Sequence, residues 1–125
     1  MLEHTPSPEE QAQISHTIEM FEVITRTQPD DYQSLETLKV AYQKLGKTDD
    51  QVRTSRRLAE AYYNGGSFAL AMQECEAVLA AEPGATLPRA MRMTLQRIRT
   101  SAEARREANA RKSAPSTDGP NKSSG

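Results

Sequence analysis

The chain carries five stretches in which apolar residues recur every three or four positions, and none in which apolar and polar residues alternate. The first spacing places apolar side chains along one face of an α-helix, whereas alternation would indicate a strand. The apolar faces identified in this way are Ile14, Ile18, Phe21 and Ile24; Leu35, Leu38, Tyr42 and Leu45; Val52, Ser55, Ala59 and Tyr62; Phe68, Ala71, Cys75, Val78 and Leu79; and Leu87, Met91, Leu95 and Ile98. The pattern predicts an all-α fold of about five helices.

Capping residues mark the ends of the first two helices. Ser7 and Glu10 match a capping box around Pro8, and this helix should end near Thr27. An Asp-Asp pair then caps the second helix, which Gly46 ends. Loops this short make neighbouring helices antiparallel.

The same signals delimit the later helices. The third follows "KTDD" and ends at "NGG", and Ser67 is expected to cap the fourth. The fifth should begin after Gly84, with Pro88 tolerated in its first turn.

Beyond the fifth apolar stripe, the sequence still favours a helix but has nothing large to bury. The last residues are rich in Ser, Pro and Gly. We therefore expect a helical domain over residues 7–98, a basic helical extension over 99–112 and a disordered tail over 113–125.

Two segments twenty residues apart repeat one spacing of Leu, Ala, Tyr and Gly: "LKVAYQKLG" from Leu38 and "LAEAYYNGG" from Leu58. With the helix that ends in "EPG", the second segment resembles the tetratricopeptide repeat, a helix-turn-helix unit of about 34 residues. The matching positions are Leu58, Ala59, Tyr62, Gly66, Phe68, Ala71, Cys75, Val78 and Pro83. Residues 29–46 match the first half of another repeat, so the third helix would serve two repeats at once.

This resemblance implies antiparallel helix-turn-helix repeats whose first helices line a concave groove for a peptide or helix of another protein. The positions implied to face it are Gln33, Glu36, Val40 and Gln43 of the second helix and Arg53, Arg56, Glu60, Tyr63 and Asn64 of the third. The alternative is that these are ordinary solvated faces, with Arg56 and Glu60 forming an i,i+4 pair worth a few tenths of a kcal/mol. Members that clamp a peptide's terminal carboxylates carry Lys and Asn where Glu36 and Val40 stand here, which argues against that partner.

The sequence offers few candidate catalytic or metal-binding residues. The single cysteine, Cys75, lies on an apolar stripe and should be a buried small residue, and His4 and His16 have no further ligands at metal-binding spacing. No catalytic triad, glycine-rich phosphate loop or isolated carboxylate pair is recognisable. We therefore expect no catalysis, no cofactor and no metal. The methionines at helical spacing, Met72, Met91 and Met93, are expected to fill the core.

The sequence carries no signal for a membrane or for secretion. No apolar run approaches the roughly 18 residues of a membrane span. The segment "MLEHTPSPEE" lacks the basic start and apolar core of a secretory signal. A cytoplasmic protein is therefore expected.

Charge is divided along the chain. Residues 1–85 hold 7 Lys and Arg against 14 Asp and Glu, and residues 86–112 hold 8 against 2, so their net charges are −7 and +6. A basic segment can bind nucleic acid or an anionic surface. The residues available for this are Arg89, Arg92, Arg97, Arg99, Arg105, Arg106, Arg111 and Lys112. Two features argue against nucleic-acid binding: the segment has no aromatic residue to stack on bases, and the acidic part of the chain would repel phosphate.

The function expected is therefore a scaffold or adaptor that binds another protein. The alternatives are binding of nucleic acid or an anionic surface through the basic helix, and a terminal interaction module of a larger bacterial protein. About three repeats are usually needed to bury a continuous core, and this chain has about two. A weak homodimer is expected for that reason, through Leu95 and Ile98 or through Ile14 and Ile18.

Overall fold

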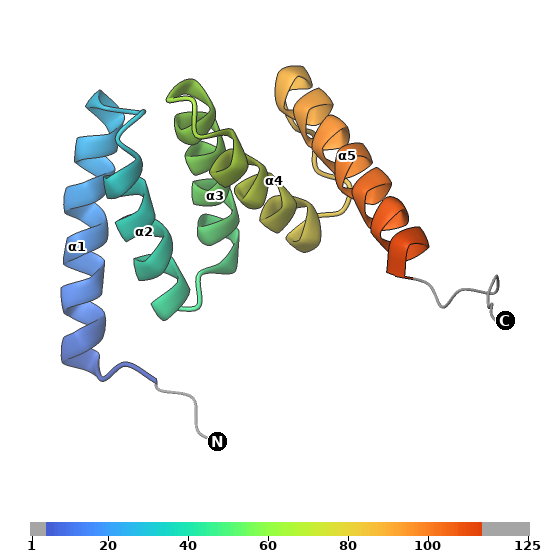
Figure 1. The fold of residues 1–125 in the computed structure, drawn as a ribbon. Helices are drawn as coiled ribbons and strands as arrows, with labels where there is room; N and C mark the ends of the chain where they lie inside the picture. Colours follow the sequence, from blue (N-terminus) through green and yellow to red (C-terminus); the bar gives the residue numbers. More distant parts are fainter. Residues whose placement is uncertain (1–4, 114–125) are drawn as a thin grey trace, which may run out of the picture. The chain divides into compact units, whose positions relative to one another are not determined.

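Five helices make up the regular structure of the computed structural model, which describes residues 5–113 (Figure 1). They are α1 (Pro8–Thr27), α2 (Tyr32–Lys44), α3 (Thr48–Asn64), α4 (Phe68–Ala81) and α5 (Arg89–Ser113). No strand occurs within that range, so the all-α prediction is confirmed. The tail expected over residues 113–125 lies outside the described residues, apart from Ser113 at the end of α5.

Contacts between residues divide the chain into two units, and the division falls between Met91 and Arg92. The first unit contains α1 to α4 and the start of α5, and the second contains the rest of α5. Within the first unit, α1 packs on α2, α2 on α3 and α3 on α4. These four helices alternate in direction, as their short loops predict (Figure 1).

Side-chain caps begin α1 and α2 as predicted. Ser7 Oγ accepts from the Glu10 amide at 3.2 Å, and Glu10 Oε1 accepts from the Ser7 amide at 2.8 Å. Asp31 accepts from both the hydroxyl and the amide of Ser34, at 2.8 and 3.2 Å. These two hydrogen bonds lower the pKa of Asp31, so the cap is ionised at neutral pH.

The twenty-residue sequence repetition corresponds to a repeated turn. Gly46 and Gly66 both have positive φ angles, 70° and 85°, in the left-handed region that favours glycine. In each turn the amide of the next residue donates to the carbonyl of a tyrosine: Lys47 to Tyr42 at 2.9 Å, and Ser67 to Tyr62 at 2.8 Å. The same type of backbone turn therefore joins α2 to α3 and α3 to α4.

Ser67 does not act as the side-chain cap that the sequence suggested. It occupies the N-cap position of α4, but its side chain makes no capping hydrogen bond. Its ψ angle is 69°, whereas Ser7 has the extended value of 165°. Asp31 caps α2 at a similar ψ of 86°, with a carboxylate that reaches one atom further than a serine hydroxyl.

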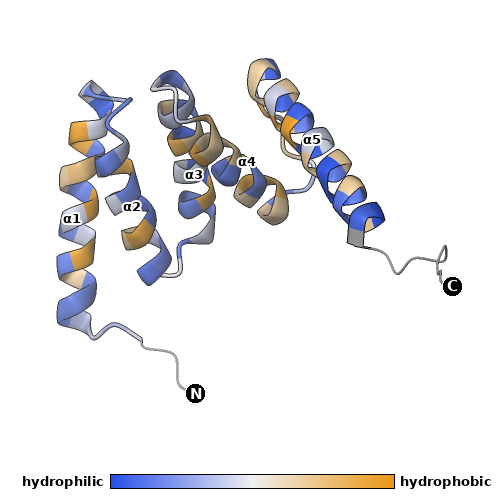
Figure 2. Ribbon diagram, viewed as in Figure 1, coloured by the Kyte–Doolittle hydropathy of each residue, from blue (hydrophilic) through white to orange (hydrophobic). Residues whose placement is uncertain are grey.

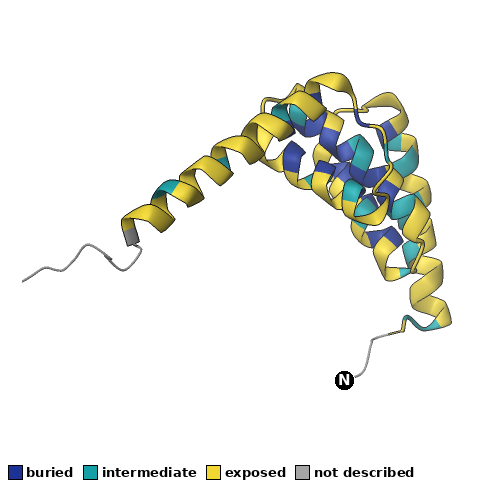
Figure 3. Cartoon of the chain, turned by 90° about the vertical axis from the view of Figure 1, so that its right-hand side faces the viewer, coloured by how far each residue is buried: buried dark blue, intermediate teal, exposed yellow. Residues whose placement is uncertain are grey.

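The core lies between α2, α3 and α4. Leu35, Leu38, Ala71, Cys75 and Val78 are fully shielded from solvent. Further buried apolar residues are Ala41, Tyr42, Val52, Leu58, Ala59, Ala61, Tyr62, Met72, Leu87, Met91 and Leu95. In Figure 3 the buried residues gather inside the packed helices. The predicted stripes of α2 and α3 thus form the core, with Leu45 half-buried at the end of its stripe.

Phe68 and Met93 depart from the predicted core. Phe68 is 48% exposed, and its ring contacts that of Tyr63 edge-on, with 5.0 Å between centroids. It opens α4 directly after the glycine turn, beyond the end of α3, so no helix covers it. Met93 is 49% exposed, whereas Met72 and Met91 are buried as expected.

The fifth helix begins later than predicted. Residues 85–88 are not helical, so Pro88 precedes α5 instead of lying in its first turn. A proline disfavours helical geometry in the residue before it, here Leu87, and the helix accordingly starts after the proline. Ile98, the last residue of the predicted stripe, is 43% exposed. Figure 2 shows that α5 becomes largely hydrophilic toward its C-terminal end.

Candidate functional site

Helix α1 makes polar contacts with α2 and α3 near its C-terminal end, in addition to the half-buried apolar side chains of its inner face. Glu22 accepts a hydrogen bond from the Tyr42 hydroxyl of α2 and pairs with Arg57 of α3, with 3.1 Å between Oε1 and Nη1. The other guanidinium nitrogen of Arg57 donates to Thr25 Oγ1 at 2.6 Å. Thr25 is the only residue of α1 that is fully buried. We call Glu22, Thr25, Tyr42 and Arg57 the polar clasp.

The clasp shifts the titration of its tyrosine. Burial, followed by the hydrogen bond to Glu22 and its negative charge, raises the pKa of Tyr42 to about 12. The hydroxyl is therefore protonated at neutral pH and remains a donor to the carboxylate. This hydrogen bond therefore holds the C-terminal part of α1 against α2.

Toward the N-terminal half of α1, the surface between α1 and α2 is hollowed. Three adjoining hollows have volumes of about 380, 480 and 490 Å³. Lys44 lines all three, while Ile14 and Pro6 each line two. Because they share these residues, we treat them as one surface and call it the α1–α2 groove.

The first hollow is the most apolar part of the groove. Ile14 and Thr17 of α1 face Val40 and Ala41 of α2 across it, and Glu36, Thr37 and Lys44 complete its lining. Val40 is 47% exposed, a large fraction for an apolar residue in the middle of a helix. Glu36 and Lys44 lie on either side of it along α2, so the apolar surface has an acidic end and a basic end.

Glu36 is held in place by the core. Its Oε2 accepts a hydrogen bond from the hydroxyl of Tyr62. Burial of Tyr62, together with Glu36, raises the pKa of that hydroxyl well above its ordinary value, so it stays a donor. The carboxylate at the acidic end of the groove is therefore fixed by a tyrosine of α3.

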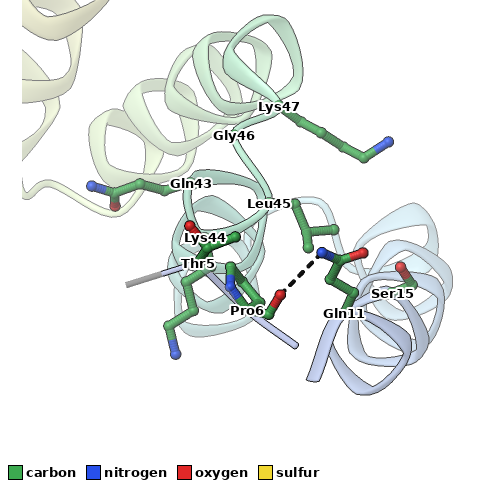
Figure 4. A pocket seen from close by; sticks show the side chains of 9 residues that line it. All are labelled: Thr5, Pro6, Gln11, Ser15, Gln43, Lys44, Leu45, Gly46 and Lys47. Carbon is green, nitrogen blue, oxygen red and sulfur yellow. Dashed lines mark hydrogen bonds between the residues drawn. The ribbon is translucent and has the colours of Figure 1, made fainter. Parts of the chain in front are cut away.

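The third hollow lies at the turn between α2 and α3 (Figure 4). Gln11 of α1 donates from Nε2 to the Pro6 carbonyl at 3.1 Å, which ties the segment before α1 to the helix. Leu45 points toward Gln11, whereas the side chains of Gln43 and Lys47 extend away from the hollow. This end of the groove is more polar than the first hollow.

The predicted partner-binding residues of α2 lie on or near this groove. Glu36 and Val40 line the first hollow, and Gln43 borders the third. Gln33 is exposed on the same helix but lines none of the three.

The predicted residues of α3 lie elsewhere, and most contact other residues of the chain. Arg56 donates to Thr86 O at 3.1 Å and pairs with Glu82 at 2.8 Å, so its partner is not Glu60. Arg53 pairs with Asp50, Asn64 Nδ2 donates to Asp30 Oδ1 at 3.2 Å, and Tyr63 contacts Phe68. The exposed Glu60 lines a separate hollow of about 300 Å³ with Arg56, Ala59, Thr86, Leu87, Pro88 and Met91.

The structure therefore does not bring the two predicted sets together. None of the hollows described contains residues of both sets: Glu36 and Val40 line one, and Arg56 and Glu60 line another. A ligand in the α1–α2 groove would contact Glu36 and Val40, and one beside Glu60 would contact a different surface.

Two groups of groove residues were not identified from the sequence. Lys44 was missed although it lies four residues after Val40, on the same face of α2, so the helical period contains the signal. The residues of α1 were missed for another reason. Ile14 was placed on the apolar face of its helix and offered as a dimer contact, and nothing in its own spacing indicates that it lines a hollow with α2.

The single cysteine, Cys75, is part of the core. The buried Cys75 Sγ lies 3.8 Å from Met91 Sδ, and burial, then Glu74 and Glu76, raises the pKa of this thiol. Cys75 is thus a core residue, as predicted, and a poor nucleophile. Among residues 5–113 no cluster of three or more His, Cys, Asp or Glu is arranged to hold a metal ion. No helix described is long and apolar enough to span a bilayer.

Comparison with known proteins found no match for this sequence among protein-family models, curated proteins or solved structures.

Proposed function

We propose that this protein is an interaction scaffold of the tetratricopeptide-like kind, which binds a segment of another protein in the α1–α2 groove. The observation that carries the proposal is the exposed Val40 beside a hollow formed with Ile14 and Ala41. An apolar side chain of the partner would fill this hollow and remove Ile14 and Val40 from water. Burial of this kind supplies most of the affinity in peptide grooves. The proposed role involves neither catalysis nor a cofactor.

The dimensions and charges of the groove suit a short segment of chain. From Glu36 to Lys44, α2 rises by eight residues, or roughly 12 Å. The fixed carboxylate of Glu36 and the ammonium group of Lys44 stand at opposite sides of Val40. A bound segment with charges complementary to both would be held in one direction, because reversing it would place like charges together.

The basic helix supports nucleic-acid binding less well. Residues 89–112 are exposed along most of α5, but their cations do not form one face. Consecutive helical residues are about 100° apart, which places Arg97 and Arg99 on nearly opposite sides, and Arg105 and Arg106 about 100° apart. A duplex would therefore meet only some of them at a time.

The proposal can be tested with peptides selected on the protein itself. A random displayed peptide library is selected against the full chain, and the selected peptides are added to isotope-labelled protein for NMR. We expect chemical-shift changes centred on Ile14, Val40 and Lys44. Val40→Glu should weaken binding at least tenfold, because a buried carboxylate would face the partner's apolar side chain.

A matched control is Val23→Glu, since Val23 is a similarly exposed valine (55%) on α1 but lines none of the hollows of the groove. It should leave peptide affinity unchanged. Shift changes confined to the surface around Arg53, Glu60 and Asn64, or equal affinity for Val40→Glu and the unaltered protein, would contradict the proposal.

A further inference from the structure

The outward side of α1 carries an apolar stripe that is separate from the groove. Ala12, His16, Met20, Val23 and Thr27 are all exposed and follow one face of the helix at the helical period. Met20 is 48% and Val23 55% exposed, the latter the highest value among the large exposed hydrophobic residues described.

Two opposite charges lie along one side of the stripe. Glu19 and Arg26 are both exposed and are seven residues apart, so they lie on nearly the same side of α1. Seven residues correspond to roughly 10 Å along a helix, too far for the two groups to pair within one chain. Each is available to a partner that offers the opposite charge at the same spacing.

A second copy of the chain offers this arrangement. We propose that two copies associate through the outward faces of their α1 helices, which run antiparallel about a two-fold axis near Val23. In that arrangement Glu19 of each copy lies beside Arg26 of the other, so the two-fold axis generates two equivalent ion pairs. Met20 and Val23 of both copies are then enclosed between the two ion pairs. A parallel arrangement would instead place Glu19 beside Glu19, so the charges select the antiparallel one.

The proposed interface differs from the faces that the sequence suggested for a dimer. Ile14 and Ile18 are half-buried on the side of α1 that faces α2, and Val23 points away from them, about 180° from Ile14 around the helix. Self-association and occupation of the groove therefore do not compete. A dimer would present two α1–α2 grooves, so a partner with two binding segments would gain affinity from both.

The expected dimer is weak. One helix face with two exposed apolar side chains buries far less than the roughly 1,600 Å² of a standard stable interface. We therefore expect a dissociation constant on the order of tens to hundreds of micromolar at low salt. Because both ion pairs are at the rim, raising the salt concentration should weaken association.

Sedimentation equilibrium of the full chain, at roughly 10 µM to 1 mM protein and at low salt, tests the proposal. Glu19→Arg and Arg26→Glu should each weaken association at least fivefold, because each reversal turns two attractions into two repulsions. The combined variant Glu19→Arg/Arg26→Glu should restore it, since the pairs are re-formed with reversed polarity. Circular dichroism of each variant confirms that the helices are intact.

The two valines again form a matched pair, with roles opposite to those in the peptide experiment. Val23→Glu should abolish self-association and Val40→Glu should leave it unchanged. A monomer throughout the concentration range, failure of the combined reversal to restore association, or greater loss with Val40→Glu than with Val23→Glu would overturn the proposal. Because peptide binding is measured separately, failure of the dimer leaves the proposed groove function standing, and the reverse also holds.

Discussion

Helices α2 to α4 and helix α1 are held in the fold by different means. In the first region, leucines and small residues such as Leu38, Leu58 and Ala71 are almost completely buried. In α1 the apolar residues of the inner face are only half-buried, and the one fully buried side chain is a threonine. Packing of fully buried side chains secures α2 to α4, whereas α1 is held by half-buried apolar side chains together with the polar clasp.

The difference explains why α1 carries the surfaces to which we assign function. In the groove, the half-buried Ile14 of α1 lies opposite Val40, which remains exposed on α2. α1 keeps one apolar surface at the groove with α2 and another on its outward side, and the directional contacts of the clasp still fix its position. The clasp provides the attachment without covering either surface.

The largest expected effect separates the two regions directly. Leu38→Ala should lower the free energy of unfolding by about 2–5 kcal/mol, since Leu38 is fully buried and a cavity would remain. Ile18→Ala, on the half-buried face of α1, should cost only about 1 kcal/mol. Urea unfolding followed by circular dichroism gives both values, and equal losses would contradict the comparison.

A smaller effect is expected from breaking the polar clasp. Glu22→Ala leaves the Tyr42 hydroxyl and the Arg57 guanidinium without their acceptor, which should cost about 1–2 kcal/mol because both partners are only partly exposed. Glu19→Ala, an exposed change on the same helix, should stay within about 0.5 kcal/mol at low protein concentration. If the two variants unfold at the same urea concentration, the clasp is not what secures α1.

The smallest expected effect is that of the Tyr42 hydroxyl, which is measured from the stability lost in alkali. Its pKa is about 12 in the folded protein and near 10 when unfolded, so the unfolded chain releases this proton first as pH rises. The stabilisation is therefore fully present below pH 10 and is lost as pH rises through 12. Urea midpoints at pH 8 and pH 11 should fall less in Tyr42→Phe than in the unaltered protein. An identical fall in both would show that this hydroxyl does not contribute.

Much of the fold could be predicted from the sequence because its determinants are local. The capping box at Ser7, the Asp31 cap and the two positive-φ glycines act within a few residues, and helical periodicity identified the buried faces of α2 and α3. The failures at Phe68 and Ser67 have the opposite origin. The exposure of Phe68 depends on where the neighbouring helix α3 ends, and the missing cap at Ser67 depends on its backbone angle. The spacing of residue types indicates neither.

The candidate site was only partly predictable for a similar reason. Periodicity shows that Glu36 and Val40 are exposed on α2, and that Arg53 and Glu60 are exposed on α3. It does not show that the two pairs line separate hollows, because that depends on how the helices pack. The contribution of Ile14 depends likewise on how closely α1 lies against α2, which the clasp and the core determine together.

Hydrogen exchange of backbone amides tests most directly whether α1 can open while the core stays folded. It is measured by NMR at a protein concentration below the dimer range. Amides of residues 14–25 should exchange through an opening of lower free energy than those of residues 35–42 and 58–62, since the clasp can open while the apolar core stays packed. Glu22→Ala should speed exchange in residues 14–25 far more than in the other two segments. Uniform protection across all three segments, lost together in Glu22→Ala, would show that α1 belongs to a single cooperative core and would contradict the account.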